Sequence, residues 1–509
     1  MHAAAAAPVR AGAATRGRVG FLAAVLVAPL LAGCHALWPN EGGGTAAFRP
    51  PRTVEPRDVL LPAGYRIEAV VTGLTYPTGV AFDGQGRPHV VESGYSYGES
   101  FTSARLLRVE PGGALTPVAS SDQVPWTGVA FHGGAFYVAS GGQVPGKPQT
   151  GRILRVRPET GAVATVLDDL PGHGDHHTNG PVAGPDGWLY FAQGTATNSG
   201  VVGPDNWKYG WLTRRPEYHD IPCQDVRLTG EVFASDDPRG DGRGRVSTGA
   251  FAPFGTAVPG GVVRGRFPCH GAVMRVRPEG GPAELVAWGF RNPFGLAFAP
   301  DGALFATDHA YDERGSRPVF GAGDVLWRVE RGRWYGWPDF HAGTPLDAGS
   351  RYSQTAKTAG LRRVLAEPLP GQPPPAAAVL AVHAGASGLD VAPASGAFGP
   401  PGRLFVAEFG DQTPEVGKVM APVGYRISVV DPRTGTVDTF AANRGRENGP
   451  ASWGKHGGLE RPLAVRFDPA GQSLWVVDFG VLMMREGAVI PVPGTGVVWR
   501  ITRAPAGER

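Results

Sequence analysis

The stretch GFRNPFGLAFAPDGALFATD, residues 289–308, decides the fold. From Gly295 onward it contains a short apolar run, a Pro-Asp-Gly turn and a second apolar run, a pattern typical of a β-hairpin. The same kind of hairpin begins at five other places: Gly79, Gly128, Asn179, Gly388 and Leu463. The segment Arg291-Asn292-Pro293 occurs only here, so the chain combines a repeated scaffold with one unrepeated polar segment.

A second phrase separates successive hairpins. It is a single apolar strand, and in several of its copies apolar and basic residues alternate. Its six copies begin at Arg105, Arg152, Gly271, Gly323, Tyr425 and Gly496. Six hairpins and six further strands in strict alternation predict six four-stranded sheets, an all-β six-bladed β-propeller over residues 57–503. A β-sandwich or two smaller barrels would also use short strands, but neither explains two phrases that repeat in fixed order.

The composition agrees with this fold. The 77 Gly and 49 Pro among 509 residues fit many tight turns, while 42% hydrophobic residues are ample for a core. The net charge is only +3, with both signs interspersed, which argues against a nucleic-acid partner. The hairpins are unevenly spaced because long insertions fill residues 196–270, 310–323 and 336–386. We expect these loops to build the walls of a pocket on one face.

The first 33 residues are typical of a signal peptide. A basic region precedes an apolar run over residues 21–32, which is too short to span a bilayer. The run ends in Leu31-Ala32-Gly33-Cys34, which resembles the lipobox of bacterial lipoproteins. This resemblance implies cleavage before Cys34 and attachment of a lipid to its sulfur. The alternative is an ordinary signal peptide followed by an accidental cysteine.

A lipid at Cys34 predicts a soluble body anchored to a membrane of the bacterial cell envelope, on the periplasmic or extracytoplasmic side. Residues 34–56 are rich in Gly, Ala and Pro without a period, which indicates a flexible tether. Two further cysteines, Cys223 and Cys269, most often pair in an oxidising compartment. Two unrelated buried thiols are the alternative. Neither belongs to a C-x-x-C-H motif, so no covalent haem is expected.

Three polar positions stand at the entrances of predicted hairpins. His176 precedes the third hairpin and could act as a general base, although a lone His is more often a hydrogen-bonded loop residue. Arg291 and Asn292 offer a permanent cation and a neutral amide, suited to an anion or a carbonyl, but an Arg that caps blade carbonyls is as plausible. Arg461 places another cation before the last hairpin.

Three ordered motifs together resemble a known family. They are His176-x-x-x-Gly180 followed by the segment 184–190 (GPDGWLY), then the segment 289–296 (GFRNPFGL), then Tyr335-Gly336-Trp337-Pro338. This pattern resembles the soluble glucose/sorbosone dehydrogenases, which are quinoprotein propellers that use pyrroloquinoline quinone (PQQ) and calcium. The resemblance covers roughly residues 60–503. The segments 220–223 and 267–269 are more similar to the sorbosone-dehydrogenase-like branch.

The resemblance implies roles for individual residues. His176 matches the catalytic base that takes the proton of a sugar hydroxyl, and Arg291 the arginine that polarises the quinone carbonyl. Asn292 matches a hydrogen-bond partner of the cofactor, and Arg461 an arginine on the cofactor's carboxylates, where a bidentate ion pair is suitable. Gln123 matches a glutamine near the substrate, which we count among the cofactor-site residues.

Calcium in the family is held largely by backbone carbonyls, and a gapless alignment places these at Ala310 and Tyr311. The chain also departs from the family. Thr195 stands where the glucose enzyme has an Asp, and a second arginine beside Arg461 is replaced at Leu463. A cofactor-binding lysine falls near position 410, and Lys418 is the nearest candidate to replace it.

The resulting hypothesis is a PQQ- and calcium-dependent oxidoreductase of the cell envelope, which oxidises a sugar or a related alcohol or aldehyde. Electrons would leave to an external acceptor. One alternative is a calcium-dependent lactonase-type hydrolase, for which carboxylates at strand ends are available: Asp308, Asp312 and Glu408. The other is a non-catalytic propeller that binds a partner through its loops.

Overall fold

The computed structural model describes residues 39–144, 147–148, 150–353, 361–445, 448–485 and 487–505. The chain divides into two compact units, Met1–Asn40 and Glu41–Arg509. The expected signal peptide and Cys34 lie outside the described residues, so the account below concerns the second unit. Within the described part, no helix is long and apolar enough to cross a membrane.

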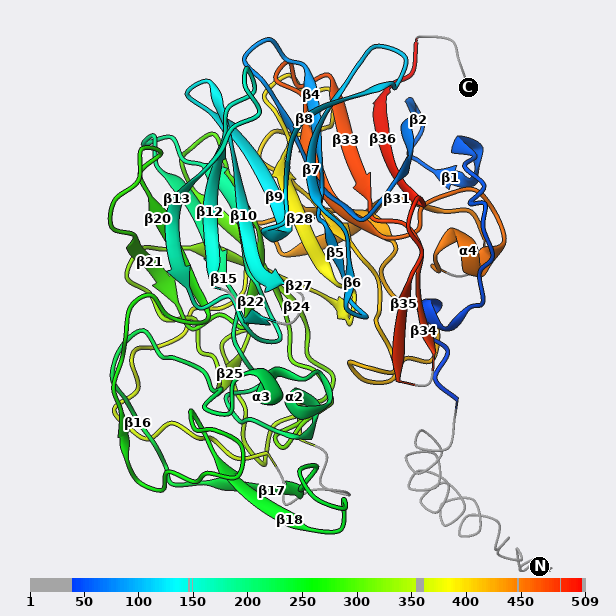
Figure 1. The fold of residues 1–509 in the computed structure, drawn as a ribbon. Helices are drawn as coiled ribbons and strands as arrows, with labels where there is room; N and C mark the ends of the chain where they lie inside the picture. The colour runs from blue at the N-terminus through cyan, green and yellow to red at the C-terminus, as the bar shows by residue number, and fades with distance from the viewer. Residues whose placement is uncertain are drawn as a thin grey trace, which may run out of the picture. The chain divides into compact units, whose positions relative to one another are not determined.

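The prediction of an all-β six-bladed propeller is confirmed (Figure 1). Blade 1 contains β3 (Pro77–Phe82), β4 (Pro88–Glu92), β7 (Ala104–Val109) and β8 (Leu115–Ser121). Blade 2 contains β9 (Val124–His132), β10 (Ala135–Val144), β12 (Gly151–Val156) and β13 (Val163–Leu170), with β11 (Lys147–Pro148) at its edge. Blade 3 contains β14 (Thr178–Ala183), β15 (Leu189–Gln193), β20 (Ala272–Val276) and β21 (Glu284–Trp288).

The second half of the ring follows the same order. Blade 4 contains β22 (Asn292–Phe298), β23 (Leu304–His309), β24 (Gly323–Val329) and β27 (Ala378–Val382). Blade 5 contains β28 (Ala386–Val391), β29 (Leu404–Glu408), β30 (Arg426–Asp431) and β31 (Thr436–Asn443), with β1 (Val59–Leu60) at its edge. Blade 6 contains β32 (Pro462–Phe467), β33 (Ser473–Asp478), β36 (Gly496–Arg503) and β2 (Tyr65–Leu74).

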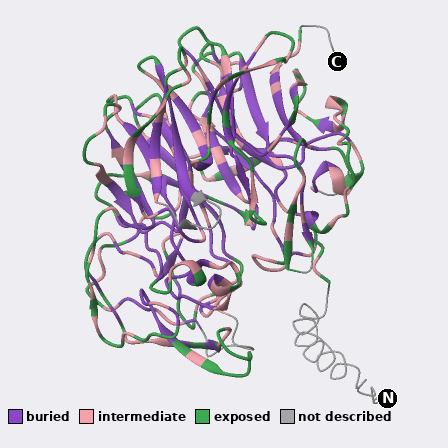
Figure 2. Ribbon diagram, in the orientation of Figure 1, coloured by how far each residue is buried: buried purple, intermediate pink, exposed green. Residues whose placement is uncertain are grey.

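Every predicted phrase occupies an equivalent place in its blade. The hairpins form the two innermost strands, and the second phrases form the third strands β7, β12, β20, β24, β30 and β36. The blade strands carry buried apolar residues on both faces, because each sheet packs between two others. Figure 2 shows the strands largely buried and the turns exposed. The regular order of hairpins and second phrases in the sequence therefore corresponds to the order of strands in successive blades.

The ring closes through a strand that the repeats did not reveal. The outermost strand of blade 6 is β2, which comes from the start of the propeller and pairs antiparallel with β36 from its end. The innermost strands β3, β9, β14, β22, β28 and β32 each contact the next, and β32 contacts β3. This hydrogen-bonded closure joins the two ends of the propeller within one sheet.

Around the axis the innermost strands approach too closely for side chains. A small residue stands at the equivalent point of each: Gly79, Gly128, Gly180, Gly295, Gly388 and Ala464. A Cβ added to Gly295 would lie 2.5 Å from the Ser387 carbonyl oxygen. The space left along the axis is only about 60 Å³. The small residue near the start of each hairpin, Gly in five blades and Ala in the sixth, thus permits the blades to meet.

Residues 41–56, expected to belong to a flexible tether, pack on blades 5 and 6. The amide of Gly43 donates to Asp411 Oδ2 at 3.2 Å, and the buried Arg52 guanidinium lies 2.6 Å from Asp478 Oδ2. Glycines 43 and 44 are buried where an added Cβ would overlap neighbouring side chains. Two short 3-10 turns, η1 (Gly43–Thr45) and η2 (Pro56–Asp58), complete the segment. The low side-chain volume that suggested flexibility instead allows close packing.

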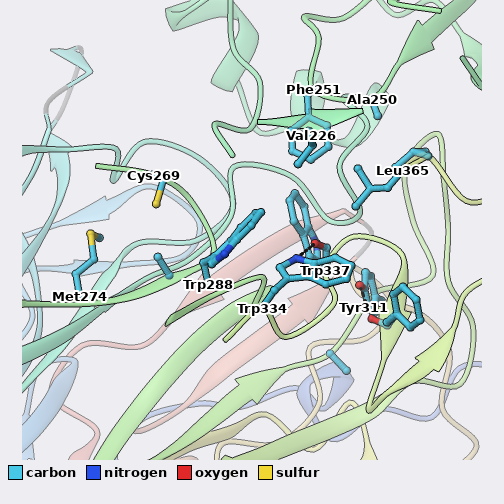
Figure 3. Packing of buried hydrophobic residues seen from close by; sticks show 14 of the residues in the cluster. Val226, Ala250, Phe251, Cys269, Met274, Trp288, Tyr311, Trp334, Trp337 and Leu365 are labelled. Atoms are coloured by element: carbon cyan, nitrogen blue, oxygen red, sulfur yellow. Dashed lines mark hydrogen bonds between the residues drawn. The ribbon is translucent and has the colours of Figure 1, made fainter. Parts of the chain in front are cut away.

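The insertion after blade 3's second strand forms a separate layer. It contains the helices α2 (Pro204–Lys208) and α3 (Trp211–Arg214) and the strands β16 (Val226–Arg227), β17 (Val232–Asp236), β18 (Arg245–Gly249) and β19 (Val262–Val263). Figure 3 shows Val226 and Phe251 of this layer beside Trp337, whose ring meets that of Phe251 edge-on at 5.8 Å. The predicted disulfide between Cys223 and Cys269 is present and closes the insertion.

Smaller elements lie in the segments that connect successive blade strands. They are the hairpins β5 (Tyr95–Ser96) with β6 (Ser100–Phe101), β25 (Phe340–His341) with β26 (Thr344–Pro345), and β34 (Leu482–Arg485) with β35 (Ala488–Pro491), together with α4 (Ala451–Gly454).

The axial glycines yield a stability prediction. We expect Gly295→Val to lower the free energy of unfolding by about 1–3 kcal/mol, because the new side chain would overlap backbone atoms of β28 that cannot move aside. Denaturant unfolding of the purified variant measures this change. The matched control is Gly371→Val, since an added Cβ there meets nothing within 4 Å. Equal stability of the two variants would contradict the steric explanation.

Candidate active site

A cavity of about 540 Å³ lies over the end of the propeller at which the innermost strands begin. Every blade contributes to its wall. The lining includes a residue within the first four of five inner strands: Thr78, Thr127, Asn292, Ser387 and Leu463. Loops form the rim, including residues 95–99, 208–211, 309–314, 409–416 and 487–489. A volume of this size falls in the range of small-molecule sites. The expected pocket on one face is therefore present.

His176 lies in the wall with its ring held by one neutral residue. Its Nδ1 is 2.9 Å from the carbonyl oxygen of Thr195 and 3.1 Å from the hydroxyl oxygen of the same residue. Because the Thr195 hydroxyl donates to the Thr197 carbonyl at 2.7 Å, both Thr195 oxygens act as acceptors. Nδ1 therefore carries the proton, and Nε2 keeps its lone pair.

The surroundings keep this imidazole neutral. Burial lowers the pKa of His176 well below 6.5, and the nearby cations Arg291 and Arg314 lower it further. A neutral ring with a fixed tautomer is ready to accept a proton at neutral pH. The residue that the sequence singled out as a base has the protonation state that a base requires.

Arg291 is fixed in the same wall by three kinds of contact. Its Nη2 lies 2.6 Å from Asp312 Oδ2, its Nε donates to the backbone and side-chain oxygens of Asn198 at 3.2 Å, and its Nη1 donates to the His309 carbonyl at 3.3 Å. Three of its five N–H donors are thus used within the described part of the chain, and two remain. The guanidinium is held rigidly yet can still bind a ligand oxygen.

Asn292 and His309 form a neutral pair next to Arg291. The Asn292 amide donates to His309 Nδ1 at 3.0 Å, so the proton of His309 is on Nε2, 3.4 Å from the Ser387 hydroxyl. Asp308 fixes the turn by accepting the backbone N–H groups of Arg291 and Asn292. Burial raises the pKa of Asp308 to about 6. The unrepeated polar segment is therefore tied to the second strand of its own hairpin.

A second arginine, Arg314, organises the carboxylates of the wall. Its guanidinium contacts Asp175 at 2.9 Å, Asp205 at 2.5 Å and Asp312 at 3.0 Å. The two arginines and three aspartates form one buried network, in which Asp312 bridges Arg291 and Arg314. The cations lower the pKa of Asp312 despite its burial. The cavity wall is thus charged but largely compensated.

The predicted calcium ligands, Ala310 and Tyr311, both line the cavity. Among the described residues, no hydrogen bond is donated to either carbonyl oxygen, whereas the Ala310 N–H is bound to Asp324 Oδ1 at 2.9 Å. Backbone carbonyls with open lone pairs beside carboxylates are donors that calcium accepts. No group of three or more His, Cys, Asp or Glu side chains within the described ranges could hold a metal. These residues therefore fit a carbonyl-based calcium site.

Three predicted cofactor residues do not reach the cavity wall. Arg461 is buried behind Phe409, and its guanidinium donates to the carbonyls of residues 409, 410, 411 and 482. Lys418 is half-buried and Gln123 lies at the start of blade 2, and neither lines the cavity. Arg461 thus caps blade carbonyls, a role that was also plausible for Arg291. These carbonyls are far from Arg461 in the sequence and meet only in the folded ring, so the sequence could not show that Arg461 binds them.

Several wall residues could not be predicted from the sequence. The cations Arg314 and Lys208 come from insertions, where no repeat defines a register; Lys208 Nζ lies 2.6 Å from Glu415. Tyr97, on the turn between β5 and β6, lines the cavity and is 37% exposed. The length of the insertion over residues 310–323 was the available signal for Arg314.

The carboxylates considered for a hydrolase do not gather. Glu408 is fully buried against Arg426 and Ser428 and is not part of the cavity wall. Asp308 accepts backbone N–H groups, and Asp312 is paired with two arginines. No observation in the described structure favours the lactonase-type alternative.

Comparisons with known proteins concern the family and the fold. A family model for Glucose / Sorbosone dehydrogenase matches residues 268–383. No curated protein matches the chain by sequence. The holo form of the PQQ domain of pyranose dehydrogenase from Coprinopsis cinerea is similar in structure (14% identity, 91% of this chain and 100% of that chain, TM-score 0.50). So is a calcium structure of a Trichoderma reesei carbohydrate-active enzyme of family AA12 (15% identity, 89% and 98%, TM-score 0.50).

A further structure, the PQQ-bound aldose sugar dehydrogenase from Streptomyces coelicolor, aligns with 17% identity over 87% of this chain and 99% of that chain, with a TM-score of 0.48. At these identities the two structures with a TM-score of 0.50 support the fold alone. The family match includes Arg291, Asn292, Ala310 and Tyr311. It confirms the resemblance to glucose/sorbosone dehydrogenases and supports a sugar oxidoreductase.

The state of His176 can be measured directly. We expect ¹⁵N NMR at about pH 6 to show a neutral imidazole that is protonated on Nδ1, because burial and two arginines hold its pKa well below 6.5. The signal is assigned by its loss in His176→Asn. Two equivalent protonated nitrogens at that pH would show instead that the cavity stabilises the cation.

Proposed function

We propose that this protein oxidises a sugar, or a related alcohol or aldehyde, with PQQ and calcium, and that it belongs to the sorbosone-dehydrogenase-like branch. The observation that carries this proposal is a neutral His176 with an open Nε2, in one cavity with a rigid Arg291 that has donors to spare. Oxidation of an alcohol requires a base for the hydroxyl proton and an electrophilic group beside the hydride acceptor, and here both face the same space.

His176 supplies the base. Its Nδ1 proton is bound to Thr195, so only Nε2 can accept the proton of a substrate hydroxyl. Arg291 and Arg314 disfavour an imidazolium, which promotes release of that proton after the reaction. Both effects suit a base that acts repeatedly at neutral pH.

The wall residues suit the proposed cofactor. Arg291 and Asn292 offer N–H donors to quinone and carboxylate oxygens, and the carbonyls of Ala310 and Tyr311 offer ligands to calcium. When bound, PQQ supplies an electrophilic quinone carbonyl that accepts the hydride, and calcium polarises it. The aromatic side chains of Tyr97, Trp211 and Phe409 give apolar surface against which a sugar ring can pack.

The surroundings of the enzyme are part of the proposal. Because the sequence has no C-x-x-C-H motif, reducing equivalents would pass to a separate acceptor. The lipobox-like segment before Cys34 supports a lipid anchor in the cell envelope, an oxidising location that agrees with the disulfide between Cys223 and Cys269.

Titration of the purified protein with PQQ tests the cofactor. We expect tight binding of PQQ in the presence of calcium and much weaker binding after calcium is chelated. Calorimetry measures both affinities. Reduction of an artificial dye across a panel of sugars then identifies the substrate. Failure of PQQ to bind with excess calcium would overturn the proposal.

The base is tested by His176→Ala. We expect kcat to fall by about 10²- to 10⁴-fold while PQQ still binds, since general base catalysis contributes about this much. His132→Ala, at the end of β9 and outside the cavity wall, is the matched control. Unchanged turnover in His176→Ala would remove this residue from the mechanism.

A further inference from the structure

The peptide unit between Thr195 and Ala196 lies between His176 and a second ionisable group. Its carbonyl oxygen accepts from His176 Nδ1 at 2.9 Å, and its N–H donates to Asp220 Oδ1 at 2.6 Å. A carboxylate, an amide and an imidazole are thereby connected through a single planar group. Hydrogen bonds arranged in such a chain polarise one another.

Asp220 is bound firmly to this loop. Besides the Ala196 N–H, it accepts the Thr197 N–H at 3.3 Å and the Thr197 hydroxyl. The Thr197 carbonyl in turn accepts the hydroxyl proton of Thr195, the second acceptor for His176. Both oxygens that hold the imidazole therefore depend on contacts that Asp220 makes.

The same loop also positions Arg291. The Thr195 N–H donates to the Arg291 carbonyl at 2.8 Å, and both Asn198 oxygens accept from Arg291 Nε. Displacement of residues 195–198 would therefore disturb the proposed base and the proposed electrophile together.

Asp220 itself is held from its other side. Three residues later Cys223 is joined to Cys269, and the adjacent His270 exchanges hydrogen bonds with Ile221. His270 Nε2 donates to the Pro171 carbonyl at 3.0 Å, in the loop that precedes His176. The disulfide thus belongs to the frame that holds the carboxylate against the peptide.

Asp220 is fully buried, and no cation forms a salt bridge with it within the described ranges. Burial raises its pKa to about 7, with the charge of Asp175 adding to the shift, while the bonds from residues 196 and 197 oppose it. The other titratable groups beside it are Tyr218, His219 and, behind Ile221, His270. An uncompensated carboxylate acts on the amide that it contacts more strongly than a paired one would.

We propose that Asp220 is a positioning residue for His176, which orients the imidazole and increases its basicity through the Thr195–Ala196 peptide unit. This inference rests on the proposed role of His176 as the base. The residue that contacts the imidazole directly is the neutral Thr195. The carboxylate of Asp220, which belongs to the insertion, acts on the imidazole through the peptide unit between them.

The Nδ1–H resonance of His176 tests the proposal without cofactor or turnover. In Asp220→Asn we expect this resonance to move upfield and to exchange faster with water, because a neutral amide polarises the peptide less. In the wild type it should shift with a midpoint near pH 7, where Asp220 titrates, although His176 itself remains neutral. That midpoint should be missing from Asp220→Asn.

The matched control is Asp225→Asn, in the same segment but solvent-exposed and paired with Arg264. We expect it to leave the resonance and its pH dependence unchanged. A wild-type resonance without a midpoint near pH 7, or one unaffected by Asp220→Asn, would overturn the proposal. The wild-type titration needs no variant, so a variant that fails to fold does not prevent the test.

Kinetics provide the second measurement. We expect Asp220→Asn to lower kcat by at least about tenfold with little change in KM, because an ill-positioned base affects the reaction more than binding. If the protein lacks dehydrogenase activity while the resonance responds to Asp220, the coupling stands and the proposed function fails. If turnover is present and the resonance does not respond, the proposed function stands and the coupling fails.

Discussion

The close approach of six strands around one axis is the constraint on which this structure depends. At the narrowest point a Cβ on Gly388 would lie 2.8 Å from the Ala464 Cα, and one on Gly128 would lie 3.0 Å from the Gly180 carbonyl oxygen. Only Gly, or Ala at position 464, fits there, so the inner strands meet as a ring. The ring gathers their first residues in a circle, and the cavity lies over that circle. Side chains from blades far apart in sequence thereby face one space.

Charge within that space is organised by pairing. Arg291 and Arg314 share Asp312, and Arg314 also contacts Asp175 and Asp205. Such a network fixes the geometry of the wall before any ligand arrives, which is the main requirement of electrostatic catalysis. It also means that an anionic ligand must share these cations with resident carboxylates. His176, held only by neutral oxygens, combines a neutral imidazole with an Nε2 that is suited to accept a proton.

The sequence predicted the features that repeat and the motifs that lie next to them. Twelve phrases with strand periodicity identified the blades, and His176, Arg291, Asn292, Ala310 and Tyr311 indeed meet at one cavity. Arg461 could not be placed, because its direction depends on carbonyls of residues 409–411 and 482 that only the closed ring brings together. The segment that begins at Asp220 contributed to the family resemblance, but the contact of Asp220 with the Ala196 N–H could not be predicted, because a backbone amide leaves no distinctive residue in the sequence.

The pairing of β2 with β36 has a consequence for how the protein is made. Blade 6 takes its outermost strand from residues 65–74 and its third strand from residues 496–503. Nearly the entire chain must therefore be synthesised before that sheet can form. Until then β2 has no strand with which to pair, although the first five blades can already fold. Exposed strand edges invite pairing with other chains. The nascent propeller therefore keeps an exposed strand edge until β36 has formed, and loss of residues 65–74 or 496–503 would leave the same edge unpaired.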